Sequence, residues 1–130
     1  MTIKEVCEKY NISQDTLRYY EKAGMIPPVP RTEGGIRNYG EEELGWIEMA
    51  LCMRNAGLSV EAMSRYLALY RMGDKTISDR LKLLSEQLEI LTEQRKRINE
   101  TMDLLTYKVE RYREAEKTGK LVWDKEDAES

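Results

Sequence analysis

A run of apolar residues in the C-terminal half repeats at alternating spacings of four and three, and this heptad pattern constrains the fold more than any other feature. The repeat positions are Ile77, Leu81, Leu84, Leu88, Leu91, Arg95, Ile98, Met102, Leu105, Val109 and Tyr112. Only Arg95 is charged, and a single charge in such a seam can fix the register at a cost in stability. We therefore expect one helix over residues 76–112, about 55 Å long, with Thr76 as its cap.

The rest of the chain cannot bury a helix of this length. The sequence has only 130 residues and contains no Phe, so bulky apolar material is scarce. The seam therefore predicts a homodimer that pairs through a coiled coil over residues 76–112. Residues 113–130 are polar and acidic and predict a tail, within which Leu121–Trp123 form a short apolar segment suited to docking back.

The first 24 residues predict two short helices joined by a tight turn. Thr2 and Glu5 have the spacing of a capping box, which marks the start of the first helix. Ser13 is placed to cap the second helix, and Gly24 to end it. Two short helices joined in this way form a helix-turn-helix unit.

A Pro-rich segment and a small hairpin follow. The three prolines between residues 27 and 30 exclude helix there, and Gly34-Gly35 supplies a turn between arms at residues 29–31 and 36–39. We interpret this hairpin as a small β-wing. Helices from Glu41 to Ala56 and from Ser59 to Tyr70 complete a predicted winged helix-turn-helix domain over residues 1–72. The predicted fold class is mainly α.

The second helix and the hairpin carry residue types that bind nucleic acid. Arg and Tyr side chains donate hydrogen bonds to phosphate oxygens, and residues at the start of a recognition helix reach base edges in the major groove. The candidates for backbone contact are Arg18, Tyr19, Lys22, Arg31, Arg37 and Tyr39, and those for base contact are Gln14 and Thr16. The net charge of −3 gives no overall attraction to DNA, so the prediction depends on local placement.

Two segments of this region carry a family resemblance: T-L-R-Y-Y-E-K-A-G-M-I-P-P from Thr16 and R-T-E-G-G-I-R-N-Y from Arg31. They resemble the signature of MerR-family transcriptional regulators, and the resemblance covers residues 1 to about 70. It implies a winged helix-turn-helix followed by a long helix that pairs antiparallel in a dimer. By position, the DNA-contacting pattern of the family falls on Thr16, Arg18, Tyr19, Arg31, Arg37 and Tyr39, with Arg54 as a further candidate for backbone contact.

The resemblance also implies a mode of action. Its partners would be double-stranded promoter DNA with a pseudo-palindromic site, a second copy of the chain, and RNA polymerase. Activators of the family bend and untwist an over-long spacer so that the polymerase can engage, at a deformation cost that protein contacts offset.

Composition excludes several other classes. The chain has no His and only two Cys, so a thiolate or imidazole metal site is not expected, and no motif calls for a cofactor. An enzyme is not expected, because no phosphate loop and no nucleophile–base pair occur. No apolar run has the length of a membrane span and no signal segment opens the chain, so we expect no membrane partner and a cytoplasmic location.

The effector is the open question. Cys7 lies on the inward stripe of the first helix and is expected in the core. Cys52 resembles the lone third-helix cysteine of aldehyde- and electrophile-responsive family members, so it is either a sensor thiol or a packing residue. The alternative function is a regulator or coiled-coil adaptor without cysteine sensing, which would bind a small molecule or protein through the surface of Trp46, Met49 and Met53.

Overall fold

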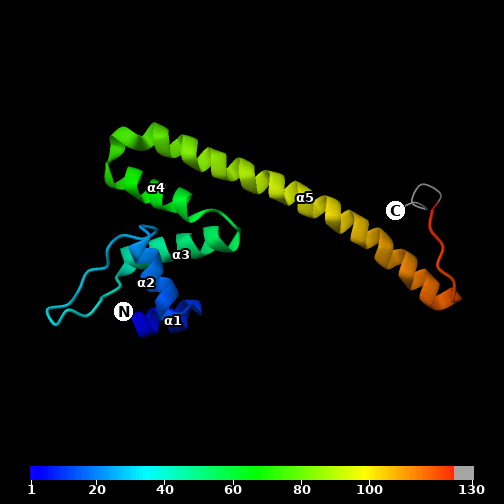
Figure 1. The fold of residues 1–130 in the computed structure, drawn as a ribbon, viewed down its shortest axis with the longest axis horizontal. Coiled ribbons are helices and arrows are strands. Elements are labelled where there is room, and N and C mark those ends of the chain that lie inside the picture. The colour runs from blue at the N-terminus through cyan, green and yellow to red at the C-terminus, as the bar shows by residue number, and fades with distance from the viewer. Residues whose placement is uncertain (125–130) are drawn as a thin grey trace. The chain divides into compact units, whose positions relative to one another are not determined.

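The computed structural model describes residues 1–124 and places nearly all of them in helices or short connections (Figure 1). The elements in chain order are α1 (Ile3–Tyr10), α2 (Gln14–Lys22), α3 (Glu41–Asn55), α4 (Val60–Arg71), the 3₁₀ turn η1 (Asp74–Thr76) and α5 (Ile77–Thr118). The prediction of a mainly α fold, with a helix-turn-helix unit before one long helix, is confirmed. The chain divides into an N-terminal unit, residues 1–88, and a C-terminal unit that begins at Glu89.

Side-chain caps start the helices where the sequence predicts them. Thr2 Oγ1 accepts the Glu5 N–H (3.2 Å), and the Glu5 carboxylate accepts the Thr2 N–H (3.0 Å). These hydrogen bonds favour the charged carboxylate and lower the pKa of Glu5. Ser13 Oγ accepts the Thr16 N–H at 3.0 Å, which caps α2. Each cap satisfies a backbone donor that has no partner inside the helix.

The end of α2 needs glycine. Gly24 adopts φ +78°, its N–H donates to the Glu21 carbonyl (3.2 Å), and the Met25 N–H donates to the Tyr20 carbonyl (2.9 Å). This is the double hydrogen bond of a Schellman motif. A Cβ at Gly24 would lie only 3.0 Å from Ser64 Oγ of α4. The motif turns the chain sharply and brings Met25 into the core, where it is fully buried.

One hydrophobic core holds the N-terminal unit together. Its buried members are Val6, Leu17, Tyr20, Met25, Ile26, Val29, Tyr39, Ile47, Ala50 and Met63. At its margin, the Tyr10 hydroxyl of α1 donates to the Glu48 carboxylate of α3 at 2.7 Å. Burial, reinforced by this hydrogen bond, raises the pKa of Tyr10 to about 12.

Trp46 and Thr76 both make contacts with α4. The Trp46 ring packs on α4 of the same chain, with ring centroids 5.8 Å from Tyr66 and 5.2 Å from Tyr70. The prediction that Thr76 caps α5 is wrong. Thr76 is buried in η1, its hydroxyl lies 2.6 Å from the Leu69 carbonyl oxygen, and tertiary packing decides its role rather than the helix start.

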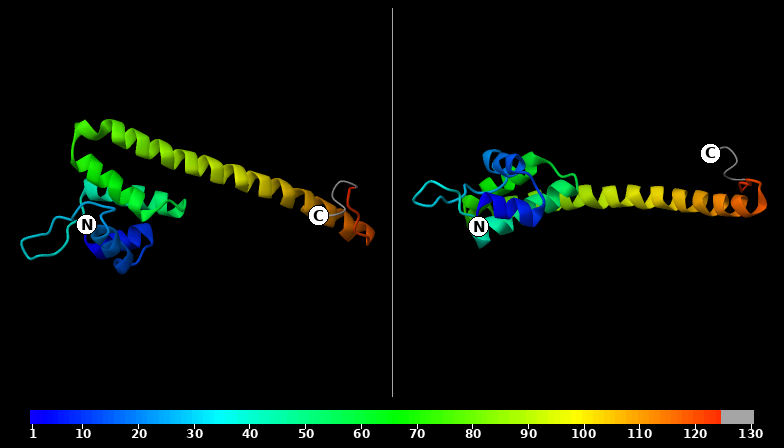
Figure 2. Two further views of the ribbon diagram at one scale, coloured as in Figure 1. Left: turned by 45° about the horizontal axis from the view of Figure 1, so that its top comes forward. Right: turned by 90° about the horizontal axis from the view of Figure 1, so that it is seen from below.

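The wing is a hairpin with a minimal ladder. Among residues 1–124 the β-structure is one antiparallel bridge, between Arg31 and Arg37. The Thr32 N–H donates to the Ile36 carbonyl (2.8 Å), and the Gly35 N–H donates to the Thr32 carbonyl (2.9 Å). Gly35 takes φ +80°, which the turn requires. Figure 2 shows this hairpin projecting from the helices of the N-terminal unit in both views.

The C-terminal unit consists of the later part of α5 and the segment that follows it. Seam residues here are largely exposed, among them Ile98, Met102, Leu105 and Val109. After Thr118 the chain turns back, and the Trp123 ring packs 5.9 Å from the Tyr112 ring and 6.2 Å from the Tyr107 ring. Docking of the Leu121–Trp123 segment is thus confirmed for Trp123. The predicted tail also covers residues 125–130, which lie outside the described residues.

Candidate nucleic-acid interface

The exposed face of α2 presents polar side chains in an ordered row. Leu17 and Tyr20 bury the opposite face of the helix, so Gln14, Arg18 and Tyr19 point to solvent. The Arg18 guanidinium donates a hydrogen bond to Gln14 Oε1 at 3.1 Å and lies 3.6 Å from the Asp15 carboxylate. Thr16 is half-buried, and its hydroxyl oxygen accepts from the Ser13 hydroxyl at 2.8 Å. The row therefore offers donors already held in position before any ligand arrives.

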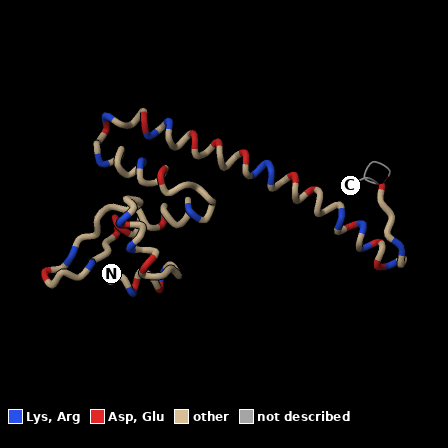
Figure 3. Tube along the Cα trace, in the orientation of Figure 1, with Lys and Arg blue, Asp and Glu red and all other residues tan. Residues whose placement is uncertain are grey.

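The wing contributes one arginine on each arm. Arg31 is exposed, and its guanidinium donates to the Gly35 carbonyl at 2.8 Å. This hydrogen bond holds the Arg31 side chain against the turn of the hairpin. Arg37 lies directly across the bridge. Figure 3 shows basic positions on both arms of the hairpin and an acidic position at its tip. Two guanidinium groups on a projecting hairpin suit contact with a phosphate backbone.

The carboxylate of Glu21 joins α2 to the wing. One oxygen accepts from Arg37 Nε at 2.9 Å, and the other accepts from the Val29 N–H at 3.0 Å. Both charged side chains are mostly covered, with 25% of Arg37 and 19% of Glu21 exposed. A hydrogen bond to a charged group contributes about 1.5–3 kcal/mol where it is shielded from water. Glu21 thus sets the position of the wing relative to the face of α2.

Tyr39 is not available as a DNA contact in this structure. It is 1% exposed and belongs to the core of the N-terminal unit. Burial is also the main cause that raises the pKa of its phenol. Its hydroxyl is buried without a hydrogen-bond partner among the described residues. The prediction placed Tyr39 with the wing arginines, but the chain turns inward after Arg37 and carries the ring into the core.

The remaining candidates lie at the end of α3 and on α1. Arg54 is exposed, and its guanidinium donates to the Leu58 carbonyl at 2.6 Å. Cys52 is exposed one helical turn before the C-cap, Ala56. Cys7 is half-buried against the core, and burial raises the pKa of its thiol. The structure thus gives the two thiols different surroundings, with solvent reaching Cys52 far more readily.

Within residues 1–124, no three Cys, His, Asp or Glu side chains come together in a way that could hold a metal ion. In the same part of the chain, no helix combines the length and the apolar character that crossing a bilayer requires.

Glu21 is the residue that the sequence interpretation missed. It stands in a charged Glu-Lys pair on a short helix, a setting typical of a solvated surface. Its partners lie 8 and 16 positions further on. The arginine on the far arm of the hairpin was visible in the sequence, but no spacing rule pairs a helical Glu with it. Only the packed geometry identifies this contact.

Comparisons with known proteins agree with this arrangement. Residues 1–69 match the family model for the MerR HTH family regulatory protein, and residues 44–107 match the model for MerR DNA binding. The HTH-type transcriptional regulator AdhR of Bacillus subtilis (strain 168) is 46% identical over 91 residues, which are 70% of this chain and 65% of AdhR. This match therefore spans slightly less than two thirds of AdhR. An uncharacterized HTH-type transcriptional regulator of Haemophilus influenzae is 34% identical over 91% of this chain and 87% of its own length.

Two solved structures are similar over most of the chain. A MerR family transcriptional regulator from Listeria monocytogenes has a TM-score of 0.83 and 45% identity, and the match covers 86% of this chain and 85% of that one. HiNmlR, a MerR family regulator lacking the sensor domain and bound to promoter DNA, has a TM-score of 0.82 and 34% identity, with 92% and 95% covered.

We predict that Glu21→Gln loosens the wing. The amide can still accept the Val29 N–H, but the charge opposite Arg37 is lost, so the free energy of unfolding should fall by about 1–2 kcal/mol. Urea denaturation at fixed protein concentration measures this change, and amide exchange at Ile36 reports the mobility of the wing. The matched control is Asp15→Asn on the same helix, where the ion pair with Arg18 is solvent-exposed and should contribute under about 0.5 kcal/mol. Equal effects of the two substitutions would contradict the role of Glu21.

Proposed function

The chain belongs to the MerR family of helix-turn-helix regulators, and from this premise we propose that it binds a pseudo-palindromic promoter as a homodimer and remodels the spacer. Members of this family are DNA-binding transcriptional regulators, and this general function applies to the chain. The observation that carries the proposal is that Glu21 of α2 forms hydrogen bonds to Val29 and Arg37 and so holds the wing beside α2. In such a unit the helix contacts base edges in the major groove of DNA, and the hairpin contacts the phosphate backbone beside it.

The roles of the side chains follow from their positions. Gln14 and Thr16, at the start of α2, are proposed to reach base edges in the major groove. Arg18 and Tyr19 on the exposed face of α2, together with Arg31, Arg37 and Arg54, are proposed to contact phosphates. Tyr39 is left out of this set because its ring is buried. A net charge of −3 means that these local donors must provide the attraction to DNA.

The homodimer is proposed from the exposed seam of α5. Apolar side chains at successive heptad positions stay open to solvent in the single chain, including Leu81, Leu88, Met102 and Leu105. Burial of apolar area at about 25 cal/mol per Å² would strongly favour pairing with a second copy. Antiparallel pairing, as in the family, would join two DNA-binding units and suit a pseudo-palindromic site, since a two-fold protein matches a two-fold operator.

Spacer remodelling and engagement of RNA polymerase are proposed from the family. The two DNA-binding domains of the proposed dimer would be held at one separation. If the two half-sites of the promoter do not match that separation, the dimer can bind both only when the DNA bends or untwists. The deformation cost depends on the spacer sequence and is offset by contacts at both ends. RNA polymerase would then meet promoter elements brought into register.

The proposed signal is a reactive aldehyde or other electrophile that adds to Cys52. The thiol first loses its proton to solvent, and the thiolate sulfur then bonds to the aldehyde carbon while the carbonyl oxygen takes up a proton. The exposure of Cys52 supports this role over a packing role.

We expect Arg37→Ala and Arg31→Ala to weaken DNA binding uniformly across sequences. Loss of one phosphate contact lowers the slope of log K against log salt concentration by about 0.9. Fluorescence anisotropy with the promoter of the protein's own gene, at several salt concentrations, measures the slope. Arg97→Ala serves as the control because Arg97 is exposed on α5. A slope unchanged in both wing variants would argue against phosphate contacts by the wing.

Dimerisation should fail in Leu105→Glu and survive in Leu104→Glu. These neighbouring leucines are similarly exposed, 54% and 50%, but only Leu105 occupies the seam. A carboxylate in the seam would be buried unpaired on association, whereas the same change outside the seam stays in water. Sedimentation velocity distinguishes dimer from monomer. If both variants remain dimers with unchanged association, the α5 seam is not the interface.

For the sensor role, we predict that Cys52→Ala removes the response to aldehyde while DNA binding persists. A promoter reporter exposed to sub-lethal formaldehyde supplies the readout, and intact-protein mass spectrometry after exposure locates the adduct. Cys7→Ala is the matched control, because burial raises the pKa of the Cys7 thiol and reduces its thiolate fraction at neutral pH. An unaltered response in Cys52→Ala would rule out the sensor role.

A further inference from the structure

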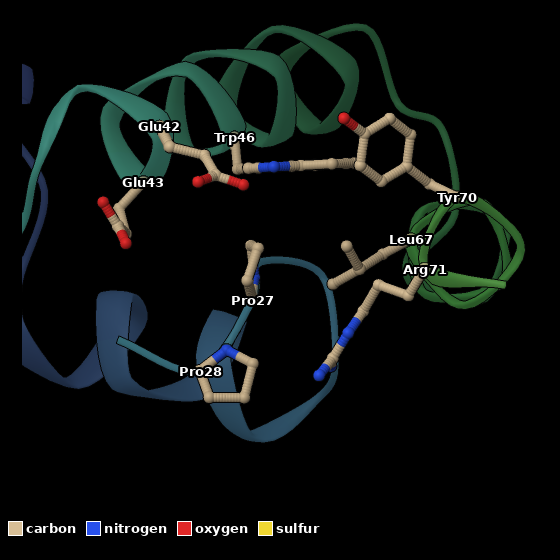
Figure 4. Close-up of a pocket in the computed structure, with 8 residues that line it drawn as sticks. All are labelled: Pro27, Pro28, Glu42, Glu43, Trp46, Leu67, Tyr70 and Arg71. Carbon is tan, nitrogen blue, oxygen red and sulfur yellow. The ribbon is translucent and has the colours of Figure 1, made fainter. Parts of the chain in front are cut away.

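A pocket in the N-terminal unit is lined by none of the proposed DNA-contact residues. Its volume is about 280 Å³, and its lining comes from the Pro-rich segment, the start of α3 and the end of α4. The lining residues are Pro27, Pro28, Glu42, Glu43, Trp46, Leu67, Tyr70 and Arg71 (Figure 4). Ligand pockets in proteins usually begin at roughly 300 Å³, so this one suits a ligand with a single ring.

The walls of the pocket are aromatic and apolar. Trp46 and Tyr70 meet edge to face with ring centroids 5.2 Å apart, and the Tyr66 ring centroid lies 5.8 Å from that of Trp46. Pro27, Pro28 and Leu67 complete the apolar lining. Figure 4 shows Pro27 across the hollow from Trp46. The flat ring of a ligand would find apolar contacts on both of its faces in this pocket. Among aromatic side chains, the indole of Trp binds a cation most strongly.

The charges in the pocket are separated. Figure 4 shows Glu42 and Glu43 at one end and Arg71 with Tyr70 at the other. Glu43 uses one carboxylate oxygen to accept the N–H of Gly40, the residue before α3, at 3.0 Å. Among residues 1–124, neither Glu42 nor Arg71 forms a salt bridge in which its charge is neutralised. Glu42 is therefore the acid free to meet a ligand.

We propose that this pocket binds a small aromatic ammonium ion, with its ring against Trp46 and its positive group toward Glu42. Two carboxylates against one guanidinium favour a cation over an anion. The separation of charges also sets the direction of the ligand, because its positive group is drawn to α3 and repelled by Arg71. The site is distinct from Cys52 and goes beyond the proposed function by adding non-covalent recognition.

The pocket is linked to the junction between α4 and α5. Tyr70 contacts Trp46 on one side and lies under the Arg80 guanidinium, 5.4 Å away, on the other. Arg80 in turn donates to the Gly73 carbonyl and the Thr76 hydroxyl oxygen, both at 3.1 Å. A ligand that displaces the Tyr70 ring would therefore disturb the contacts that hold this junction. We therefore expect occupancy of the pocket to be coupled to the geometry at the start of α5.

Binding is tested on the full chain carrying Trp123→Phe, so that tryptophan fluorescence reports Trp46 alone. The probe is benzyltrimethylammonium, compared with neutral benzyl alcohol and anionic phenylacetate. We expect saturable binding of the cation, at least five-fold weaker binding of the two other compounds, and folded protein by circular dichroism. Absence of saturable binding, or equal binding of all three compounds, would overturn the proposal.

Substitutions locate the site. Glu42→Gln should weaken cation binding at least five-fold, while Glu41→Gln removes the same charge one residue earlier, outside the pocket lining, and should change it less than two-fold. Arg71→Gln should tighten binding two- to five-fold, which keeps the test decisive even if Glu42→Gln folds poorly. Equal effects of Glu41→Gln and Glu42→Gln, or weaker binding in Arg71→Gln, would overturn the assignment.

The coupling has its own readout, promoter-DNA affinity with and without a saturating concentration of the cation. We expect the cation to change this affinity at least three-fold in the otherwise unaltered chain and less than 1.5-fold in Arg80→Met, with cation binding itself retained. An equal change in both proteins would disprove coupling through Arg80. Because the binding measurement contains neither DNA nor aldehyde, its failure is distinguishable from failure of the regulator or of the Cys52 sensor.

Discussion

The two-sided contact of Glu21 is the interaction on which the DNA-binding surface depends. Local contacts shape the helix α2 and the hairpin separately, but binding of both to one nucleic acid needs a fixed distance and angle between them. The carboxylate supplies both, because one oxygen holds a backbone N–H where the chain leaves the Pro-rich segment and the other holds an arginine on the return arm. Partial burial protects these bonds from competition by water and from salt. Arg37 is consequently held in place in the free protein, so its proposed contact with a phosphate would cost less conformational entropy.

Local rules predicted the helices well. Capping at Thr2, Ser13 and Ser59 has a short-range cause, a side-chain oxygen within three residues of an unpaired N–H, and all three caps form. The glycine stop of α2 is equally local. The seam of α5 could also be predicted, since a heptad repeat states which face is apolar without needing to know what covers it.

The features that the sequence did not predict depend on contacts between segments that are distant in the chain. The sequence interpretation placed Trp46 on a surface for a small molecule or protein, but it could not say that Tyr66 and Tyr70 of α4 would pack against this residue. Tyr39 follows an arginine in a polar hairpin, so its local sequence favours a surface role, while the core gains a large aromatic side chain from it. Thr76 has the residue type and place of a cap, yet its hydroxyl turns back to the carbonyl groups at the end of α4. In each case a contact between distant segments, and not the local sequence, decides where the side chain lies. The pocket beside Trp46 is likewise formed by segments that are distant in the chain.

The return of the chain at Trp123 has a consequence for the limits of pairing along α5. Its ring stands edge-on to that of Tyr112, the last seam position, and the Lys108 ammonium lies over its face at 4.9 Å. The Asp124 carboxylate also approaches the Arg111 guanidinium at 3.5 Å. A helix that slid along the seam by one heptad toward the C-terminus would meet this packed corner instead of an open groove. In the proposed dimer the folded-back segment would act as an end stop and discriminate against shifted alignments that the repetitive seam alone would tolerate.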